Sequence, residues 1–413
     1  MVFGKYNMTI YSKPTPILDK LEDTTVNKLT VSSKSSKNDF STALGFLTQY
    51  NGNQATFKAY RREVERLLQW AWLIAKKSIL ELKRQDIQDY IAFCLDPPKS
   101  WIGTKCVPRF IERGGSRKPN PHWRPFVATV TKQEHKQGVK PDKYKYKLSQ
   151  KSIREIFTIL SSFYNFLVLE DKIPTNPVAL VKQKSKYLQK RQQQSPVMRL
   201  TDIQWKTCIE TVKNMADDNP EKHERTLFII SALYLLYLRI SELVASDRWI
   251  PMMKHFHRQS DGSWWFKVVG KGNKLRDIAV SDDMLAALKR YREKLNLKPL
   301  RSPNEKRVLL PKEKGQGAMT DSRHVRRLIQ HCFDKTIDHL REKKLFSEAD
   351  AMESVTVHWL RHTGISDDIN KRGRPIAHVR DDAGHSSSAI TDRYNDIELR
   401  ERYESAKLKK LSK

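Results

Sequence analysis

Cysteine is scarce in this chain of 413 residues, which contains only four scattered cysteines. No two of them form the Cys-x-x-Cys pair that a zinc ribbon or a redox motif requires. They also lack the dense spacing of a small disulfide-bonded scaffold. The sequence therefore predicts no zinc site and no disulfide framework, and we expect ordinary reduced thiols at Cys94, Cys106, Cys208 and Cys332.

Long hydrophobic runs are also absent. The most apolar stretch, residues 227–238, is far shorter than the roughly 20 apolar residues that a membrane-spanning helix needs. The N-terminal residues lack the charged and then apolar pattern of a secretory signal. We therefore expect a soluble cytoplasmic protein with no membrane partner.

Two further motifs are missing. The sequence contains no glycine-rich phosphate loop ending in Gly-Lys-Ser or Gly-Lys-Thr, and no cluster of residues at metal-ligand spacing. We therefore expect a function that uses neither ATP nor a metal ion, and no cofactor.

Acidic residues are few relative to basic ones. The chain has 77 Lys and Arg against 47 Asp and Glu, which gives a formal net charge of +30. A soluble chain this basic typically binds a polyanion, and nucleic acid is the commonest one. A ribosome-associated protein, or one that is merely solubilised by its charge, is the alternative.

The first half of the chain predicts a helical domain over residues 51–183, preceded by a weakly periodic extension over residues 1–50. Apolar residues at three- and four-residue spacing predict a helix that begins with Thr56 as its N-cap. Further helices are expected around residues 86–94 and from Ser149. The basic face of the first helix supplies candidate DNA contacts at Lys58, Arg61, Arg62 and Arg66.

Residues 96–147 interrupt this helical pattern. They contain Trp101, Trp123 and seven of the 18 prolines, together with many basic residues. We interpret them as an inserted loop or small hairpin that is basic enough to lie against DNA, with a solvated spacer as the alternative. Residues 184–196 are polar, basic and nearly free of apolar side chains, as is typical of an interdomain linker.

Residues 197–413 form the second predicted domain. Its pattern predicts a helix over residues 199–215 and a buried helix over residues 225–244 that carries Arg239 near its end. Apolar runs on either side of Gly-Lys-Gly-Asn-Lys predict a β-hairpin over residues 264–280. Further helices are expected from Asp282, Ser322, Thr356 and Ser387.

The most informative pattern lies near the C-terminus. A His-x-x-Arg-His cluster, His358 to His362, is followed by the pair Gly384-His385 and, nine residues after that histidine, by Tyr394. A phenol has a pKa of about 10 and is a poor nucleophile at neutral pH unless cations and a proton acceptor surround it. Guanidinium groups match the charge of a phosphate under attack. The pattern therefore indicates attack of a tyrosine on a phosphodiester.

With these residues, the chain resembles the tyrosine recombinases, or phage integrase family, from about Thr56 onward. The resemblance rests on the cluster above, on Arg239 within Leu-Arg-Ile-Ser-Glu-Leu, and on the predicted hairpin turn. It implies a mainly α fold: a helical core-binding domain, then an α-rich catalytic domain with a small antiparallel β-sheet. It also implies a site-specific recombinase that cleaves and rejoins DNA through a 3′-phosphotyrosyl intermediate.

The resemblance also implies a role for each matching residue. Tyr394 would be the nucleophile, and Arg239 and Arg361 would bind the scissile phosphate. His358 would be the general base or a proton shuttle, and His385 a donor to a non-bridging oxygen. Lys271 in the hairpin turn would be the general acid, and we favour it over Lys274, which we expect to contact DNA. Apart from the resemblance, Glu242 lies three residues after Arg239, so on a helix it would share a face with that arginine and could orient or buffer it.

The implied partner is double-stranded DNA with inverted-repeat half-sites, bound by a dimer, with a tetramer in synapsis. Acidic residues before Gly384 and after His362 depart from the family pattern. Together with the insertion, they favour a mobile-element integrase over a housekeeping resolvase. A type IB topoisomerase and a non-catalytic DNA-binding regulator of the same fold are the alternatives.

Overall fold

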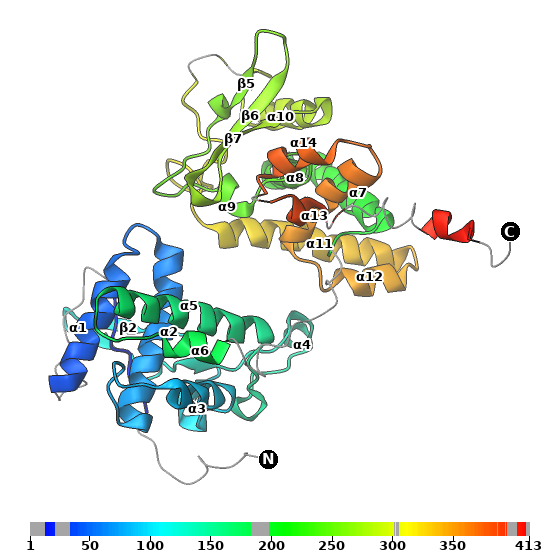
Figure 1. The fold of residues 1–413 in the computed structure, drawn as a ribbon. Coiled ribbons are helices and arrows are strands. Elements are labelled where there is room, and N and C mark those ends of the chain that lie inside the picture. Colours follow the sequence, from blue (N-terminus) through cyan, green and yellow to red (C-terminus); the bar gives the residue numbers. More distant parts are fainter. Residues whose placement is uncertain are drawn as a thin grey trace. The chain divides into compact units, whose positions relative to one another are not determined.

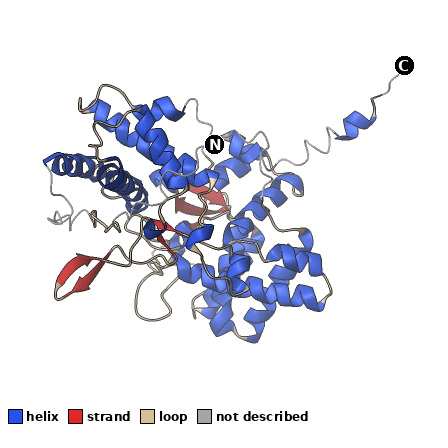
Figure 2. Cartoon of the chain, turned by 90° about the horizontal axis from the view of Figure 1, so that it is seen from below, coloured by secondary structure: helices blue, strands red, loops and turns tan. Residues whose placement is uncertain are grey.

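The computed structural model describes residues 13–20, 34–182, 198–300, 302, 305–385, 387–392, 394 and 403–409. The chain divides into two compact units, Met1–Gln193 and Gln194–Lys413. Each unit has its own hydrophobic core, and helices make up most of both (Figure 2). The predicted linker, residues 184–196, lies outside the described residues.

The first unit is built around a helical core (Figure 1). Its helices and strands are α1 (Lys34–Thr48), α2 (Gln54–Trp70), α3 (Arg84–Leu95), β1 (Ile102–Gly103), β2 (Phe110–Arg113), β3 (Ser116–Pro119), β4 (Phe126–Val127), α4 (Lys132–Lys136), α5 (Gln150–Leu169) and α6 (Pro177–Lys182). The three predicted helices correspond to α2, α3 and α5, and α5 begins directly after Ser149, which is its N-cap.

Part of the segment expected to precede this unit belongs to its core. Ile17 and Leu18 are buried, and the backbone N–H of Ile17 donates to Glu65 of α2 at 2.5 Å. Phe46 of α1 is buried as well. The predicted cap of α2 was wrong, because the side chain of Asn53 accepts a hydrogen bond from the backbone of Thr56. The helix therefore begins two residues before Thr56.

Helix α5 is long and apolar enough to cross a membrane by length and composition alone. Its apolar face, however, is buried in the core of the first unit, and the Tyr164 hydroxyl donates to the Ile79 carbonyl at 3.0 Å. We therefore interpret α5 as a core helix.

The insertion contains the predicted hairpin, in which β2 pairs antiparallel with β3 around the turn Gly114–Gly115. Its flanks are not a solvated spacer. Trp101 and Phe126 are buried in the core, and β1 pairs with β4. The insertion is thus fastened to the unit at its base.

The second unit contains more helices and a three-stranded sheet (Figure 1). Its elements are α7 (Asp202–Asp218), α8 (Pro220–Leu235), α9 (Ile240–Leu243), β5 (Phe256–Arg258), β6 (Trp264–Val269), β7 (Leu275–Ala279), α10 (Asp282–Lys294), α11 (Ser322–Glu342), α12 (Phe346–Met352), α13 (Val357–Asn370), α14 (Ile376–Ala383) and α15 (Ser388–Asp392). The predicted fold class, mainly α with a small antiparallel sheet, is confirmed.

The predicted hairpin is formed by β6 and β7, with Val269 opposite Leu275. Its turn, Lys271–Asn273, contains two left-handed residues, Gly272 and Asn273. Strand β5, which the sequence analysis did not predict, pairs antiparallel with β6 and completes the sheet.

The buried helix predicted over residues 225–244 was too long. Helix α8 ends at Leu235, and Tyr237 has a φ of 48°, in the left-handed region that breaks a helix. Arg239 has extended backbone angles and is the N-cap residue of α9. The apolar sequence continues past Leu235 because residues 236 and 238 are also buried, so the hydrophobic pattern hides the break.

Helix α13 contacts α8, α11 and α14. Its close approach to α8 depends on Gly364, because a Cβ at that position would lie 2.0 Å from the carbonyl oxygen of Tyr234. Helix α14, which the sequence analysis did not predict, ends at Gly384 in a left-handed conformation with φ of 61°.

Candidate active site

Helix α13 presents the His-x-x-Arg-His cluster. His358 and His362 lie one turn apart, and their rings meet edge to face with centroids 4.3 Å apart. Arg361 is on the same helix and is only 2% exposed. Helix α13 therefore carries a pair of contacting imidazoles, His358 and His362, and one buried guanidinium, that of Arg361.

Two backbone carbonyls hold the guanidinium of Arg361. Nη1 donates to the carbonyl of Tyr237 and Nη2 to that of Ala383, the latter at 2.6 Å. Burial, and then the positive charge of Arg239, lowers the pKa of Arg361 to about 9. A buried cation beside other cations is costly without a counterion. An anion bound here would offset that cost.

Glu242 binds two arginines at once. Its Oε1 accepts from Arg239 Nη1 at 3.0 Å, and its two oxygens accept from Arg276 Nη1 and Nη2 at 3.0 and 2.9 Å. Burial alone would raise the pKa of Glu242, but Arg276 and Arg239 hold it below its ordinary value. Arg239 Nη2 also lies 3.4 Å from the carbonyl oxygen of Gly384. Glu242 therefore orients Arg239, as expected, although Arg239 is not on a helix.

Arg276 projects from β7 into a space bounded by two glycines. Its Nε donates to the carbonyl of Asp382 at 3.0 Å. A Cβ on Gly270 would lie 2.6 Å from its Nη1, and one on Gly384 would lie 3.0 Å from its Cδ. Both glycines thus leave room for Arg276, which links the hairpin to the end of α14.

His385 follows Gly384 directly. Its Nδ1 lies 2.9 Å from the hydroxyl oxygen of Thr391. Partial burial, followed by the charges of Arg361 and Arg239, lowers the pKa of His385 to about 4. The same causes lower the pKa of His358. Both imidazoles are therefore neutral at pH 7.

Tyr394 is 4% exposed and packs against Tyr237, Ile365 and Ile369. Its hydroxyl forms a hydrogen bond with Nδ1 of His362. The phenol thus lies beside an imidazole in the same unit as the three arginines. This contact singles out His362, which the sequence analysis placed in the cluster but gave no role.

Arg276 was also missed. The hairpin was predicted, but nothing in the sequence distinguishes Arg276 from the other basic residues near that turn. Its importance arises from the packing of β7 against α14, which brings it to Glu242 and to the Asp382 carbonyl.

The two hairpin lysines lie at opposite ends of the turn. Lys271 opens it, and its side chain lies outside what the structure describes. Lys274 closes the turn and is exposed, and its carbonyl accepts from the N–H of Gly270 at 2.8 Å. The preference for Lys271 stays a prediction.

The four basic residues proposed on α2 differ in exposure. Lys58 and Arg62 are exposed, and Arg62 pairs with Glu63. Arg61 is partly buried and donates to the Asp19 carbonyl at 2.6 Å. The prediction for Arg66 must be corrected. This residue is 7% exposed and donates to Glu63 and to the Pro125 carbonyl, so its guanidinium is held in hydrogen bonds inside the first unit.

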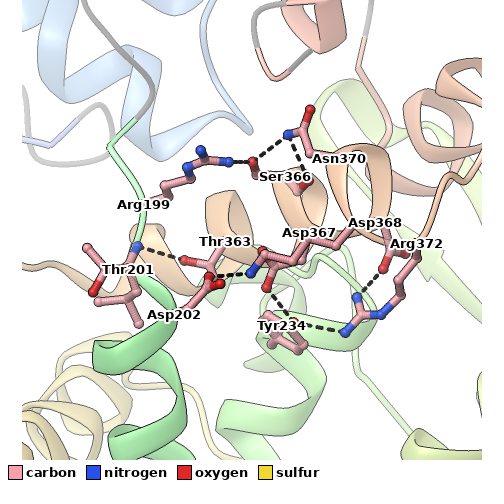
Figure 3. A network of polar contacts seen from close by, with 12 residues as sticks. Arg199, Thr201, Asp202, Tyr234, Thr363, Ser366, Asp367, Asp368, Asn370 and Arg372 are labelled. Atoms are coloured by element: carbon pink, nitrogen blue, oxygen red, sulfur yellow. Dashed lines mark hydrogen bonds and ion pairs between the residues drawn. The ribbon is translucent and has the colours of Figure 1, made fainter. Parts of the chain in front are cut away.

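The acidic residues that depart from the family pattern have a structural role. Asp367 accepts from the Tyr234 hydroxyl at 2.7 Å, and Asp368 from that of Tyr237 (Asp367 and Tyr234 in Figure 3). Arg372 binds both Asp368 and the Tyr234 hydroxyl (Figure 3). These buried contacts fasten α13 to the end of α8.

The chain is similar to several known proteins. Residues 198–400 match the model of the Phage integrase family. A tyrosine recombinase XerC from Leptospira interrogans (strain Fiocruz L1-130) is 24% identical over 253 residues, which cover 61% of this chain and 70% of that protein. A tyrosine recombinase XerD from Rickettsia prowazekii is 28% identical over 222 residues, which cover 53% of this chain and 58% of that protein.

Two solved structures share the fold. The XerH site-specific recombinase bound to its palindromic difH substrate has a TM-score of 0.52 at 14% identity, covering 92% of each chain. The Tn1549 transposon integrase in complex with circular intermediate DNA has a TM-score of 0.51 at 17% identity, covering 89% of this chain and 99% of that one.

The matched region spans nearly the whole second unit, including the arginines, histidines and tyrosine described above. Residues 198–400 belong to the phage integrase family. The protein is a tyrosine-type site-specific recombinase.

Proposed function

We propose that Tyr394 attacks a DNA phosphodiester and forms a 3′-phosphotyrosyl bond while the bond from phosphorus to the 5′ oxygen breaks. A 5′-hydroxyl of a partner strand then attacks the phosphotyrosine and regenerates the phenol. The observation that carries this proposal is the hydroxyl of Tyr394 at His362, in the unit that also holds Arg239, Arg276 and Arg361. The ester bond is exchanged rather than hydrolysed, so no ATP is needed.

The charges around Arg361 support phosphate binding. Burial, and then the positive charge of Arg239, lower its pKa, and Glu242 opposes this shift only in part. Preorganised donors of this kind stabilise charge that develops in a transition state. We assign Arg239 and Arg361 to the non-bridging oxygens. Arg276 holds Glu242, and through it Arg239.

The neutral histidines support two further roles. If the Thr391 hydroxyl donates to Nδ1 of His385, the ring proton is on Nε2 and can be donated to a phosphate oxygen. The proton of Tyr394 passes to His362, which it contacts, with His358 one turn away as the alternative base. Lys271 is proposed to protonate the departing 5′ oxygen.

We further propose that double-stranded DNA with inverted-repeat half-sites is the substrate, bound by a dimer and brought together in a tetramer. The first unit contributes the core-binding domain, with Lys58, Arg61, Arg62 and the β2–β3 hairpin as DNA contacts. The net charge of +30 supports binding to a polyanion. A mobile-element integrase acting in the bacterial cytoplasm fits the insertion and the departures from the family pattern.

Covalent capture tests the proposal. A DNA substrate nicked near the scissile phosphate should trap the wild-type protein on denaturing gels, and Tyr394→Phe should bind the same DNA without becoming attached. Persistence of the covalent complex in Tyr394→Phe would show that another residue is the nucleophile. Relaxation of supercoiled plasmid by a monomer, without recombinants from paired sites, would favour the topoisomerase alternative.

A further inference from the structure

The first described residues of the second unit are bonded to α13. Arg199 donates to the hydroxyl of Ser366, and the backbone N–H of Leu200 donates to the hydroxyl of Thr363 at 2.9 Å (Arg199, Ser366 and Thr363 in Figure 3). Both hydroxyl residues are buried. The segment that opens the unit is thus fastened to the helix that carries Arg361.

Asn370, the last residue of α13, continues this chain of hydrogen bonds. Its Nδ2 donates to the hydroxyl and to the carbonyl of Ser366, both at 2.9 Å (Asn370 and Ser366 in Figure 3). The same nitrogen donates to the backbone carbonyl of Tyr394 at 2.7 Å, across 24 residues of sequence. One side-chain amide therefore joins α13 to the backbone of the proposed nucleophile.

Tyr394 is consequently attached to α13 at both ends. Its hydroxyl contacts His362, and its carbonyl accepts from Asn370. Between these points the ring packs against apolar side chains, including Ile365 and Ile369. Apolar packing is not directional. Hydrogen bonds at the two ends therefore fix where the phenol lies along the helix, relative to Arg361.

We propose that Asn370 is a positioning residue for the DNA-cleavage step. It acts through the backbone of Tyr394 and holds the phenol in line with the phosphate that Arg361 binds. This inference rests on the proposed function of Tyr394 as the nucleophile. It assigns to the amide of Asn370 a part of the reaction that neither the motif nor the charge pattern indicated.

Two substitutions in the full-length chain, Asn370→Leu and Asn370→Asp, remove the amide donor and leave a side chain of similar size. Each should leave DNA binding unchanged and slow single-turnover formation of the covalent complex by about 10²-fold, the scale expected when a reacting group is displaced by roughly 1 Å. Agreement between the two excludes the added charge as the cause. Asn214→Asp, at an exposed position of α7, makes the same chemical change away from the site and should cleave normally.

A second readout separates positioning from a loss of structure. In a Tyr394→Phe background, hydrogen peroxide is supplied as an external nucleophile. Its oxygen attacks the same phosphorus, and the same 5′ oxygen leaves. On this proposal Asn370 affects cleavage through Tyr394, so Asn370→Leu should leave the rate of peroxide cleavage nearly unchanged. An equal loss in both backgrounds would mean that Asn370 only supports the fold, and the inference would fail.

The outcomes also separate this inference from the proposed function. If the wild-type protein forms no covalent complex through Tyr394, the proposed function itself fails. If it does, and both Asn370 variants cleave at the wild-type rate, only the positioning role of Asn370 is overturned.

Discussion

The hydroxyl of Tyr394 forms a hydrogen bond with Nδ1 of His362, across 32 residues of sequence. The family resemblance assigns the general base to His358, whereas this contact favours His362. The rings of His358 and His362 are in contact, with centroids 4.3 Å apart, so an experiment must decide which of the two is the base.

We predict that His362→Ala slows cleavage by about 10²-fold or more, the usual contribution of a general base. The rate of this variant should recover as the pH rises, because more of the phenolate then forms without a base. Single-turnover cleavage of a nicked substrate from pH 7 to 9.5 measures this recovery. His358→Ala is the matched comparison, and recovery in that variant alone would identify His358 as the base.

Arg239→Lys and Arg361→Lys should each reduce the cleavage rate by about 10²- to 10³-fold, the loss typical of one preorganised donor. Different nitrogens of Arg361 bond to two carbonyls, and the single ammonium of lysine cannot reproduce that planar arrangement. Arg323→Lys, at a residue with a side chain 87% exposed, is the control. Cleavage near the wild-type rate in both lysine variants would argue against guanidinium binding of the phosphate.

Gly384→Ala should abolish most cleavage, because the new methyl group would lie 3.0 Å from Cδ of Arg276 and displace it from Glu242. Gly373→Ala is a closely matched control. Its φ of 64° is similar to the 61° of Gly384, so both variants carry the same left-handed backbone cost, but nothing lies within 4 Å of its added Cβ. The melting temperature should therefore fall in both variants, whereas the cleavage rate should fall only in Gly384→Ala. Equal cleavage by the two variants would remove Arg276 from the site.

Lys271→Ala should slow cleavage much more than Lys274→Ala. A substrate with sulfur in place of the bridging 5′ oxygen has a leaving group that needs no proton, so it should restore cleavage by Lys271→Ala. Rates on the oxygen and sulfur substrates measure the effect. Failure of the sulfur substrate to restore cleavage would make Lys271 a phosphate contact and place the acid elsewhere.

The sequence predicted much of this fold because its amphipathic helices are regular. Helix α5 begins at the predicted position, directly after Ser149, since both a capping serine and the apolar spacing are local properties. Arg239, Arg361, His358, His385 and Tyr394 could likewise be proposed as site residues, because their order along the chain carries the signal.

What the sequence did not predict depends on packing between distant segments. The break after Leu235 lies within a continuous apolar run, where hydrophobicity cannot distinguish a helix from a buried turn. Arg276 becomes important only when β7 packs against α14. Asp367 and Asp368 depart from the family pattern, and the structural reason is not visible in the sequence. They accept hydrogen bonds from a tyrosine of α8 and from one in the turn after it.

The last prediction concerns pH and His385. Its pKa is lowered to about 4 from an ordinary value of 6.5, chiefly by burial and then by Arg361 and Arg239. Between these pH values the unfolded chain binds a proton that the folded chain does not. Stability from this group is therefore fully present above pH 6.5 and is lost as the pH falls toward 4.

The side chain introduced by His385→Gln cannot titrate. As the pH falls over that interval, the melting temperature of this variant should therefore fall less than that of the wild type, with both measured without DNA. His255, whose pKa is also lowered to about 4, is present in both proteins, so the difference between them isolates His385. Parallel melting profiles from pH 7 to 4.5 would show that His385 titrates normally. Burial beside Arg361 and Arg239 would then not keep this ring neutral as the pH falls below 6.5.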